Sequence, residues 1–185
     1  MMKENIKIKG EAVITVCDMR SLEALALQEK IVNATGQEYR DLVSELHSKF
    51  FKRRVVARNL CPTVGRAVVA ARLAGILTYT GTINYCALGT DSTTADNTDI
   101  ALGAEVYRKL VSSKTFDDNI AYFSTFFTAT ETNGTYEEVG HFIDGAVGAD
   151  TGQLFSRIED SETAELPITK SNTESLTVDY RCTIS

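Results

Sequence analysis

The sequence has few of the residues from which compact reactive or metal-binding sites are built. Its 185 residues include two histidines, two prolines, four cysteines and no tryptophan. The cysteines, at positions 17, 61, 86 and 182, lie far apart and form no CxxC pair, which excludes the spacing typical of zinc sites and redox motifs. We therefore expect no metal, no cofactor, and four reduced cysteines buried as small apolar side chains.

Long apolar runs are missing as well. No stretch approaches the roughly 18 apolar residues of a membrane-spanning helix. The N-terminal MMKENIKIKG leads into no apolar run long enough for a signal peptide. We expect a soluble chain that does not enter a membrane, assembles inside a cell and has a core of its own.

Charge of one sign dominates the chain. Acidic residues outnumber basic ones by 25 to 19, and the pI is near 5.0, so we do not expect nucleic acid as a partner. The exception is KFFKRRVVAR, which contains no acid. It is either a solvated helix end or a docking surface, where apolar side chains stand inside a charged rim. The candidate docking residues are Lys49, Phe50, Phe51, Lys52, Arg53, Arg54 and Arg58.

The first half of the chain predicts one strand followed by three helices. Residues 6–17 are rich in β-branched side chains and indicate a strand. Ser21 is placed to cap a helix that Gly36 ends. A third helix is expected between Pro62 and Gly75. The second helix, after Gly36, would have on one face Tyr39, Leu42, Val43, Leu46 and Phe50.

From residue 82 onwards the sequence predicts strands. Asn133-Gly134 is typical of a two-residue hairpin turn, so the runs on either side of it are expected to pair. In the last run, alternation gives a wet face with Thr177, Asp179 and Arg181, opposite an apolar face. Six runs of strand length, separated by turn residues, indicate an antiparallel sandwich: TINYCAL, AEVYRKLVSS, NIAYFSTFFTAT, TYEEVGHFID, GQLFSRIE and ESLTVDYRCTI.

These patterns together predict a single domain over residues 1–185. It is mainly β, with an antiparallel β-sandwich, an inserted N-terminal helical hairpin and one further helix, and is α+β overall. The expected parts are an N-terminal strand (1–20), a helical hairpin that serves as an attachment (21–58), and the sandwich with its leading helix (59–185).

No combination of residues matches a catalytic motif. His47 is expected on the solvent side of its helix. His141 has acidic neighbours, among them Glu137, Glu138 and Asp144, which have the chemistry of a metal or acid–base cluster. Adjacent strand residues point to opposite faces, however, and a histidine beside acids on a wet face is common. We expect no enzymatic activity.

The stretch CALGTDSTTADNTDIALGAEVYRK predicts a strand, a polar loop and a second strand. Asp91, Asp96 and Asp99 suggest a calcium loop, but their order does not match an EF-hand, and a weakly bound cation remains an alternative. The small polar side chains can instead hydrogen-bond their own backbone and hold an irregular path. Glu105 and Arg108 follow, where a charge pair would lock the base of the second strand or bridge to a neighbour.

Several short motifs follow one another along roughly residues 59–184: NLCPTVGRAVVAARLAG, YCALGT, the Thr/Asp loop, LGAEVYRK, NGTYEEVGHFIDG, GQLFSRI and SLTVDYRCTI. Their order resembles the N-terminal, particle-attaching module of bacteriophage tail-collar fibre proteins and related short virion proteins. The chain departs from that family because it stops without a shaft and carries the helical hairpin. By this resemblance the framework positions are Gly89, Glu105, Arg108, Gly134, Glu138 and Gly140.

The resemblance implies a non-enzymatic virion structural protein of the tail or baseplate, assembled in the host cytoplasm. Its expected partners are other virion proteins and copies of itself, as a trimer or hexamer. A capsid-decoration or head-fibre protein is the alternative within this class, and it would be present in many more copies per particle. From another class, a carbohydrate-binding module would use Tyr79, Tyr85 or Tyr122 as a stacking platform.

Overall fold

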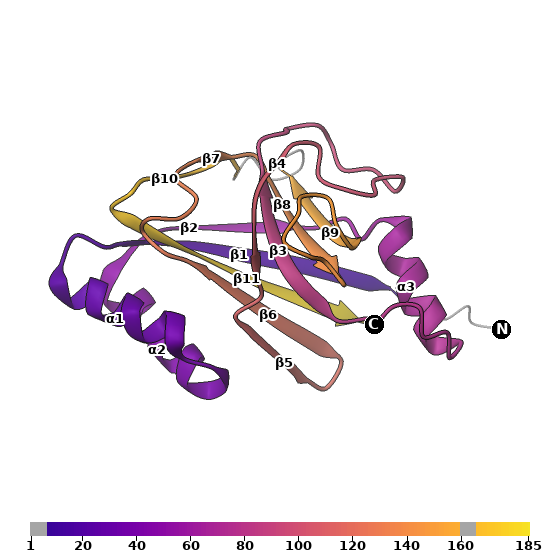
Figure 1. Cartoon of the computed structure of the whole chain (residues 1–185), viewed down its shortest axis with the longest axis horizontal. Coiled ribbons are helices and arrows are strands. Elements are labelled where there is room, and N and C mark those ends of the chain that lie inside the picture. Colours follow the sequence, from indigo (N-terminus) through magenta and orange to yellow (C-terminus); the bar gives the residue numbers. More distant parts are fainter. Residues whose placement is uncertain (1–6, 160–165) are drawn as a thin grey trace.

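The computed structural model describes residues 7–159 and 166–185. These residues form two antiparallel sheets packed face to face, with three helices outside them (Figure 1). The expected mainly β, α+β sandwich is confirmed. The elements are β1 (Ile8–Asp18), α1 (Leu22–Asn33), α2 (Gly36–Phe50), β2 (Phe51–Arg58), α3 (Thr63–Leu73), β3 (Ile83–Gly89), β4 (Glu105–Leu110), β5 (Ser113–Asp117), β6 (Ile120–Phe127), β7 (Gly134–Tyr136), β8 (Glu138–Ile143), β9 (Gln153–Glu159), β10 (Ile168–Lys170) and β11 (Glu174–Ile184).

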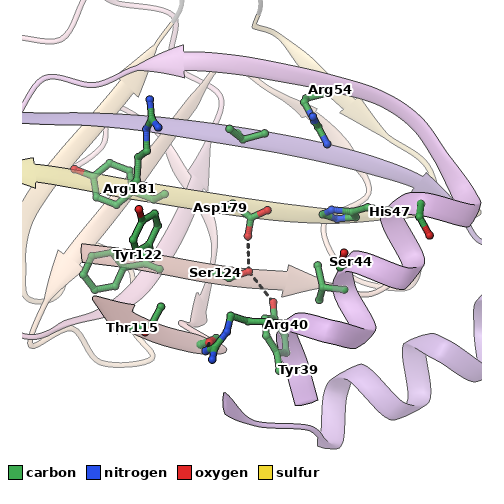
Figure 2. Close-up of a pocket in the computed structure, with 16 residues that line it drawn as sticks. Tyr39, Arg40, Ser44, His47, Arg54, Thr115, Tyr122, Ser124, Asp179 and Arg181 are labelled. Carbon is green, nitrogen blue, oxygen red and sulfur yellow. Dashed lines mark hydrogen bonds between the residues drawn. The ribbon is translucent and has the colours of Figure 1, made fainter. Parts of the chain in front are cut away.

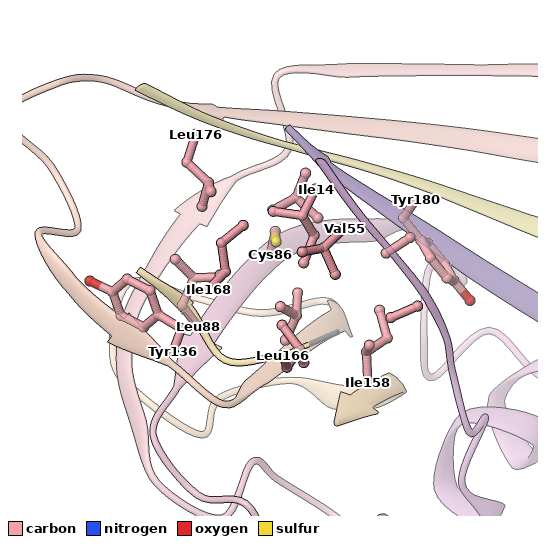
Figure 3. Packing of buried hydrophobic residues seen from close by; sticks show 14 of the residues in the cluster. Ile14, Val55, Cys86, Leu88, Tyr136, Ile158, Leu166, Ile168, Leu176 and Tyr180 are labelled. Atoms are coloured by element: carbon pink, nitrogen blue, oxygen red, sulfur yellow. The ribbon is translucent and has the colours of Figure 1, made fainter. Parts of the chain in front are cut away.

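The two sheets enclose the main core. The five-stranded sheet has the order β2-β1-β11-β6-β5, and the four-stranded sheet has the order β4-β3-β8-β9; β7 and β10 form a separate pair. Ile14 of β1 meets Leu88 of β3 and Ile158 of β9 in this core, and all three side chains are fully buried (Figure 3). Because alternate residues of each strand face inward, the apolar half of every central strand is removed from water. The four cysteines are buried and free, as expected.

The sandwich is closed along one side and open along the other. On the closed side, Leu60 continues from β2 and exchanges two backbone hydrogen bonds with Arg157 of β9, at 2.9 and 3.0 Å. On the other side, β4 and β5 are the last strands of their sheets. Residues 105–117 therefore run along both sheet edges, and no described strand pairs with their outer side.

The helices cover opposite ends of the sandwich (Figure 1). Ser21 caps α1, because its Oγ accepts a hydrogen bond of 3.1 Å from the Ala24 amide. The apolar faces of α1 and α2 pack with Cys17 and Phe126 on the outer face of the five-stranded sheet. Helix α3 packs on β9, where Gly65 lies against the Phe155 backbone. Among the described residues, no helix has the length and apolar character to cross a membrane.

Some expected boundaries were wrong. The helical hairpin ends at Phe50, and residues 51–58 are strand β2 rather than its continuation. Alternation explains this, since Val55 and Ala57 point into the core while Arg54 and its neighbour Val56 are more exposed. Gly36 does not end α1, which stops at Asn33; with φ at +58° it begins α2.

The expected hairpin at Asn133-Gly134 does not form either. Strand β6 pairs with β5 and β11, whereas β7, which follows that turn, pairs with β10. The positive φ lies at Thr132, at +51°, and not at the glycine. Strands β5 and β10 are short and were not predicted from the sequence, and the predicted run TYEEVGHFID is divided between β7 and β8.

Candidate functional site

The polar loop at residues 90–104 is fixed by one buried arginine. Arg157 of β9 has a side chain only 3% exposed and bonds three carboxylates. The contacts are Nη2 to Asp91 at 3.1 Å, Nη1 to Asp99 at 2.8 Å and Nε to Glu138 at 2.9 Å. The third loop acid, Asp96, accepts hydrogen bonds from its own loop at Thr98. Asp91 and Asp99 therefore neutralise an arginine in this structure, where the sequence suggested a calcium loop.

Glu138 joins this loop to the sheet. Its carboxylate is fully buried and accepts hydrogen bonds from the amides of Gly103 at 3.0 Å and Ala104 at 2.8 Å, in addition to Arg157. A buried carboxylate with a cation and two amides is fully compensated. Glu138 thus has a structural task, which is to hold the loop against the sheet.

The expected pair of Glu105 and Arg108 is confirmed. Arg108 Nε and Nη2 bond the two Glu105 oxygens at 2.5 and 2.7 Å, and both side chains are nearly buried. The guanidinium also donates to Thr151 Oγ1 at 2.7 Å and lies 4.6 Å from the centre of the Phe142 ring. The pair consequently fixes residues 146–151 against β4. Tyr85, also beside this guanidinium, is only 8% exposed and offers no stacking platform.

Two of the three framework glycines are required by close packing. A Cβ at Gly89 would collide with the Glu138 carboxylate and lie 2.8 Å from the Ala104 carbonyl oxygen. At Gly140 it would lie 2.8 Å from Leu102 Cδ2. At Gly134 the nearest atom is 3.4 Å away, so nothing in the packing excludes a side chain there.

The basic segment does not form one continuous cationic surface. Lys52 and Arg53 both form ion pairs with Glu174, whose side chain is 4% exposed. These two cations favour the ionised form of the Glu174 carboxyl group. The Glu174 pKa falls to about 2, against the effect of desolvation, because of these cations and the Ser171 amide. Lys49 bonds Glu23 and Glu45. Phe50 is half-buried, while Phe51 and Arg58 are exposed.

A cavity of about 640 Å³ lies on the outer face of the five-stranded sheet, under α2. The register brings Val13, Asp179 and Ser124 into one row across β1, β11 and β6, with Ser113 next to them on β5. Helix α2 closes one side, and β2 contributes Arg54 from the other (Figure 2). The face that was expected to be wet is therefore partly roofed by a helix, which leaves a cavity that is still open to solvent.

A chain of hydrogen bonds forms the floor of this cavity (Figure 2). Tyr39 Oη and Ser124 Oγ are 2.9 Å apart, and Ser124 Oγ donates to Asp179 Oδ1 at 2.6 Å. Burial raises the pKa of Asp179, an effect that Arg54 partly opposes. His47, expected in solvent, is instead partly buried, with Nε2 3.1 Å from Thr177 Oγ1. Desolvation, with a smaller contribution from Arg54, lowers the His47 pKa to about 4.

His141 was also misplaced by the sequence interpretation. It is fully buried between the sheets and stacks on Tyr180, with ring centroids 4.3 Å apart. Desolvation lowers its pKa to about 3. No group of three or more potential metal ligands occurs within the described ranges. His141 is therefore a neutral core residue.

Sequence reasoning missed the cavity because it treated α2 and the last strand separately. The apolar face of α2, with Tyr39, Val43 and Leu46, requires a sheet face to cover it. The partly polar face of β11 is that surface, and one sign was the apolar side chain of Phe126 beside Thr177.

Comparisons of the chain with protein-family models, curated proteins and solved structures gave no match.

Proposed function

We propose that the chain is a non-enzymatic structural subunit of a bacteriophage virion, attached to the tail or baseplate and assembled with copies of itself. The order of motifs along residues 59–184 supports the class of protein. The charged motif residues also support a framework role, because Glu105, Arg108 and Glu138 are occupied in holding loops. Chemistry on a substrate would need groups that are free to change partner or protonation state.

The observation that carries the assembly is the open side of the sandwich. Along residues 105–117, the unpaired edges of β4 and β5 present Val106, Leu110 and Phe116, which are 53%, 57% and 79% exposed. Unpaired strand edges with large apolar side chains favour pairing with another chain. A second copy, or a neighbouring virion protein, would cover this edge by adding strands or by packing on it.

The test compares oligomeric mass in solution for an edge variant and a control variant. Val106→Glu combined with Phe116→Glu places charges on the open edge, and Leu22→Glu places one on α1, where Leu22 is 86% exposed. Light scattering at two salt concentrations should give a trimer or hexamer for the wild type and for Leu22→Glu, and a monomer with unchanged circular dichroism for the edge variant. An edge variant that assembles as the wild type does would exclude this surface as the contact.

Copy number separates the tail from the head. Quantitative mass spectrometry of purified particles should find the protein at a few copies to some dozens for a tail or baseplate position. Many more copies would instead support capsid decoration or a head fibre.

Within the basic segment, the residues that remain candidates for docking are Phe51, Arg54 and Arg58. Lys49, Lys52 and Arg53 already have carboxylate partners within the chain.

A further inference from the structure

Two charged groups at the cavity under α2, Arg54 and Asp179, form no ion pair with any described residue and act on each other only at longer range. Arg54 has no carboxylate within ion-pair distance among the described residues, and its guanidinium lies 5.7 Å from the centre of the Phe51 ring. Asp179 receives one hydrogen bond, from Ser124 to Oδ1, and no described residue donates to its Oδ2. In contrast, Arg108 and Arg157 are fully paired. The charges at the cavity are thus available to a ligand.

The arrangement of the lining indicates the chemistry of that ligand. Arg54 from β2 and Arg40 from α2 flank the cavity, with Asp179 and Ser124 between them (Figure 2). Arg40 Nη2 donates to Gln37 Oε1 of its own helix at 2.6 Å, while Nη1 makes only a long contact of 3.5 Å with Ser113 Oγ in the cavity. Guanidinium groups bind carboxylates, whereas a carboxylate acceptor such as Asp179 requires a donor, for which a ligand hydroxyl is suited.

The rest of the lining favours a polyhydroxylated ligand. Hydroxyl groups of Ser44, Ser113 and Thr115 line the walls, and Tyr122, 36% exposed, stands at the far end from Arg54. Aromatic rings of this kind stack on the apolar faces of sugar rings. A cavity of about 640 Å³ lies within the range of small-molecule sites and far exceeds the size of a lone carboxylate.

We propose that this cavity binds a short acidic saccharide, with two uronate rings, whose carboxylates pair with Arg54 and Arg40 and one of whose hydroxyls donates to Asp179. The second ring extends toward Tyr122. This binding site goes beyond the proposed virion role and does not depend on it.

Isothermal titration calorimetry at pH 8 with digalacturonate, cellobiose and acetate tests the proposal. Digalacturonate should bind at least about ten-fold more tightly than either control ligand, because charge-assisted hydrogen bonds add to those of the hydroxyls. Arg54→Gln should weaken digalacturonate about ten-fold. Arg58→Gln is the matched control: it removes the same charge from the same strand, outside the cavity, and should change affinity less than about two-fold.

Asp179→Asn distinguishes a saccharide site from a simple anion site. Asparagine Oδ1 can still accept the Ser124 hydrogen bond, so the fold should persist, as circular dichroism would check. The substitution should weaken digalacturonate, which loses its acceptor, and should leave acetate equal or tighter, since a like charge has gone. The proposal is overturned if digalacturonate binds the wild type no better than cellobiose does, or fails to bind it at millimolar concentration. It is also overturned if Asp179→Asn binds both digalacturonate and acetate more tightly than the wild type does.

Discussion

Burial of His141 should make the fold sensitive to mild acid. The imidazole is fully buried, stacks on Tyr180, and has no hydrogen-bond partner for either ring nitrogen among the described residues. Desolvation lowers its pKa from 6.5 to about 3. The unfolded chain therefore binds a proton more readily than the folded chain does. Stability from this residue is fully present above pH 6.5 and is lost as the pH falls toward 3.

The size of the effect follows from those two pKa values. At pH 5 an unfolded histidine is protonated about thirty-fold more often than not, while the buried one stays neutral. This difference lowers the free energy of unfolding by about 2 kcal/mol relative to pH 8. For a domain of this size, that loss corresponds to a melting temperature lower by about 4–8 °C.

Urea unfolding followed by far-UV circular dichroism at pH 8 and pH 5 measures this loss. His141→Phe keeps the ring stack on Tyr180 and removes the titrating group, so its change between the two pH values should be smaller than the wild type's by about 2 kcal/mol. His141→Leu repeats the test without a ring. His47→Gln should reduce the pH dependence of the free energy of unfolding by less than the His141 variants do, because water screens a partly exposed group. Equal pH dependence in the wild type and both His141 variants would refute the reasoning.

Two further predictions concern the framework around the polar loop. Arg157→Met should lower the free energy of unfolding by about 3–5 kcal/mol, because buried Glu138 loses its cation; urea unfolding measures this loss. The same substitution should speed amide exchange across residues 91–104, which hydrogen-exchange experiments measure. Gly89→Ala should cost about 1–3 kcal/mol by overpacking, whereas Gly134→Ala, with its nearest contact at 3.4 Å, should stay within about 0.5 kcal/mol of the wild type in the same urea titration.

The sequence predicted the elements whose signals are local. Polar and apolar residues alternate in β11 from Ser175 to Ile184, and Ser21 caps α1 as its type and position indicate. The Asn133-Gly134 turn was predicted by the same local logic and failed, because β6 already has partners on both sides, β5 and β11. Pairing is decided by the whole sheet, which a two-residue signal does not report.

The basic segment shows why the site was harder to predict than the fold. The pattern of KFFKRRVVAR suggests a helix end or a docking surface, yet only its first two residues end α2, and alternation places residues 51–58 in β2, with Val55 facing the core. Its cations then meet Glu174, a residue more than 100 positions away in the chain. An ion pair of this kind depends on strand order, so charge counts along the sequence could identify the cations but not their partners.

Charged side chains have two different roles in this protein: some hold the polar loop in place, and others border the cavity under α2. Arg157 and Arg108 lie in the interior, where an unpaired charge would be costly, and each is paired with carboxylates close by. Arg54 and Asp179 border an open cavity, where water can solvate them until a ligand replaces it. Charges that are already paired have little left to offer a ligand, so recognition is expected at the cavity, while the loop network maintains the shape of the sandwich.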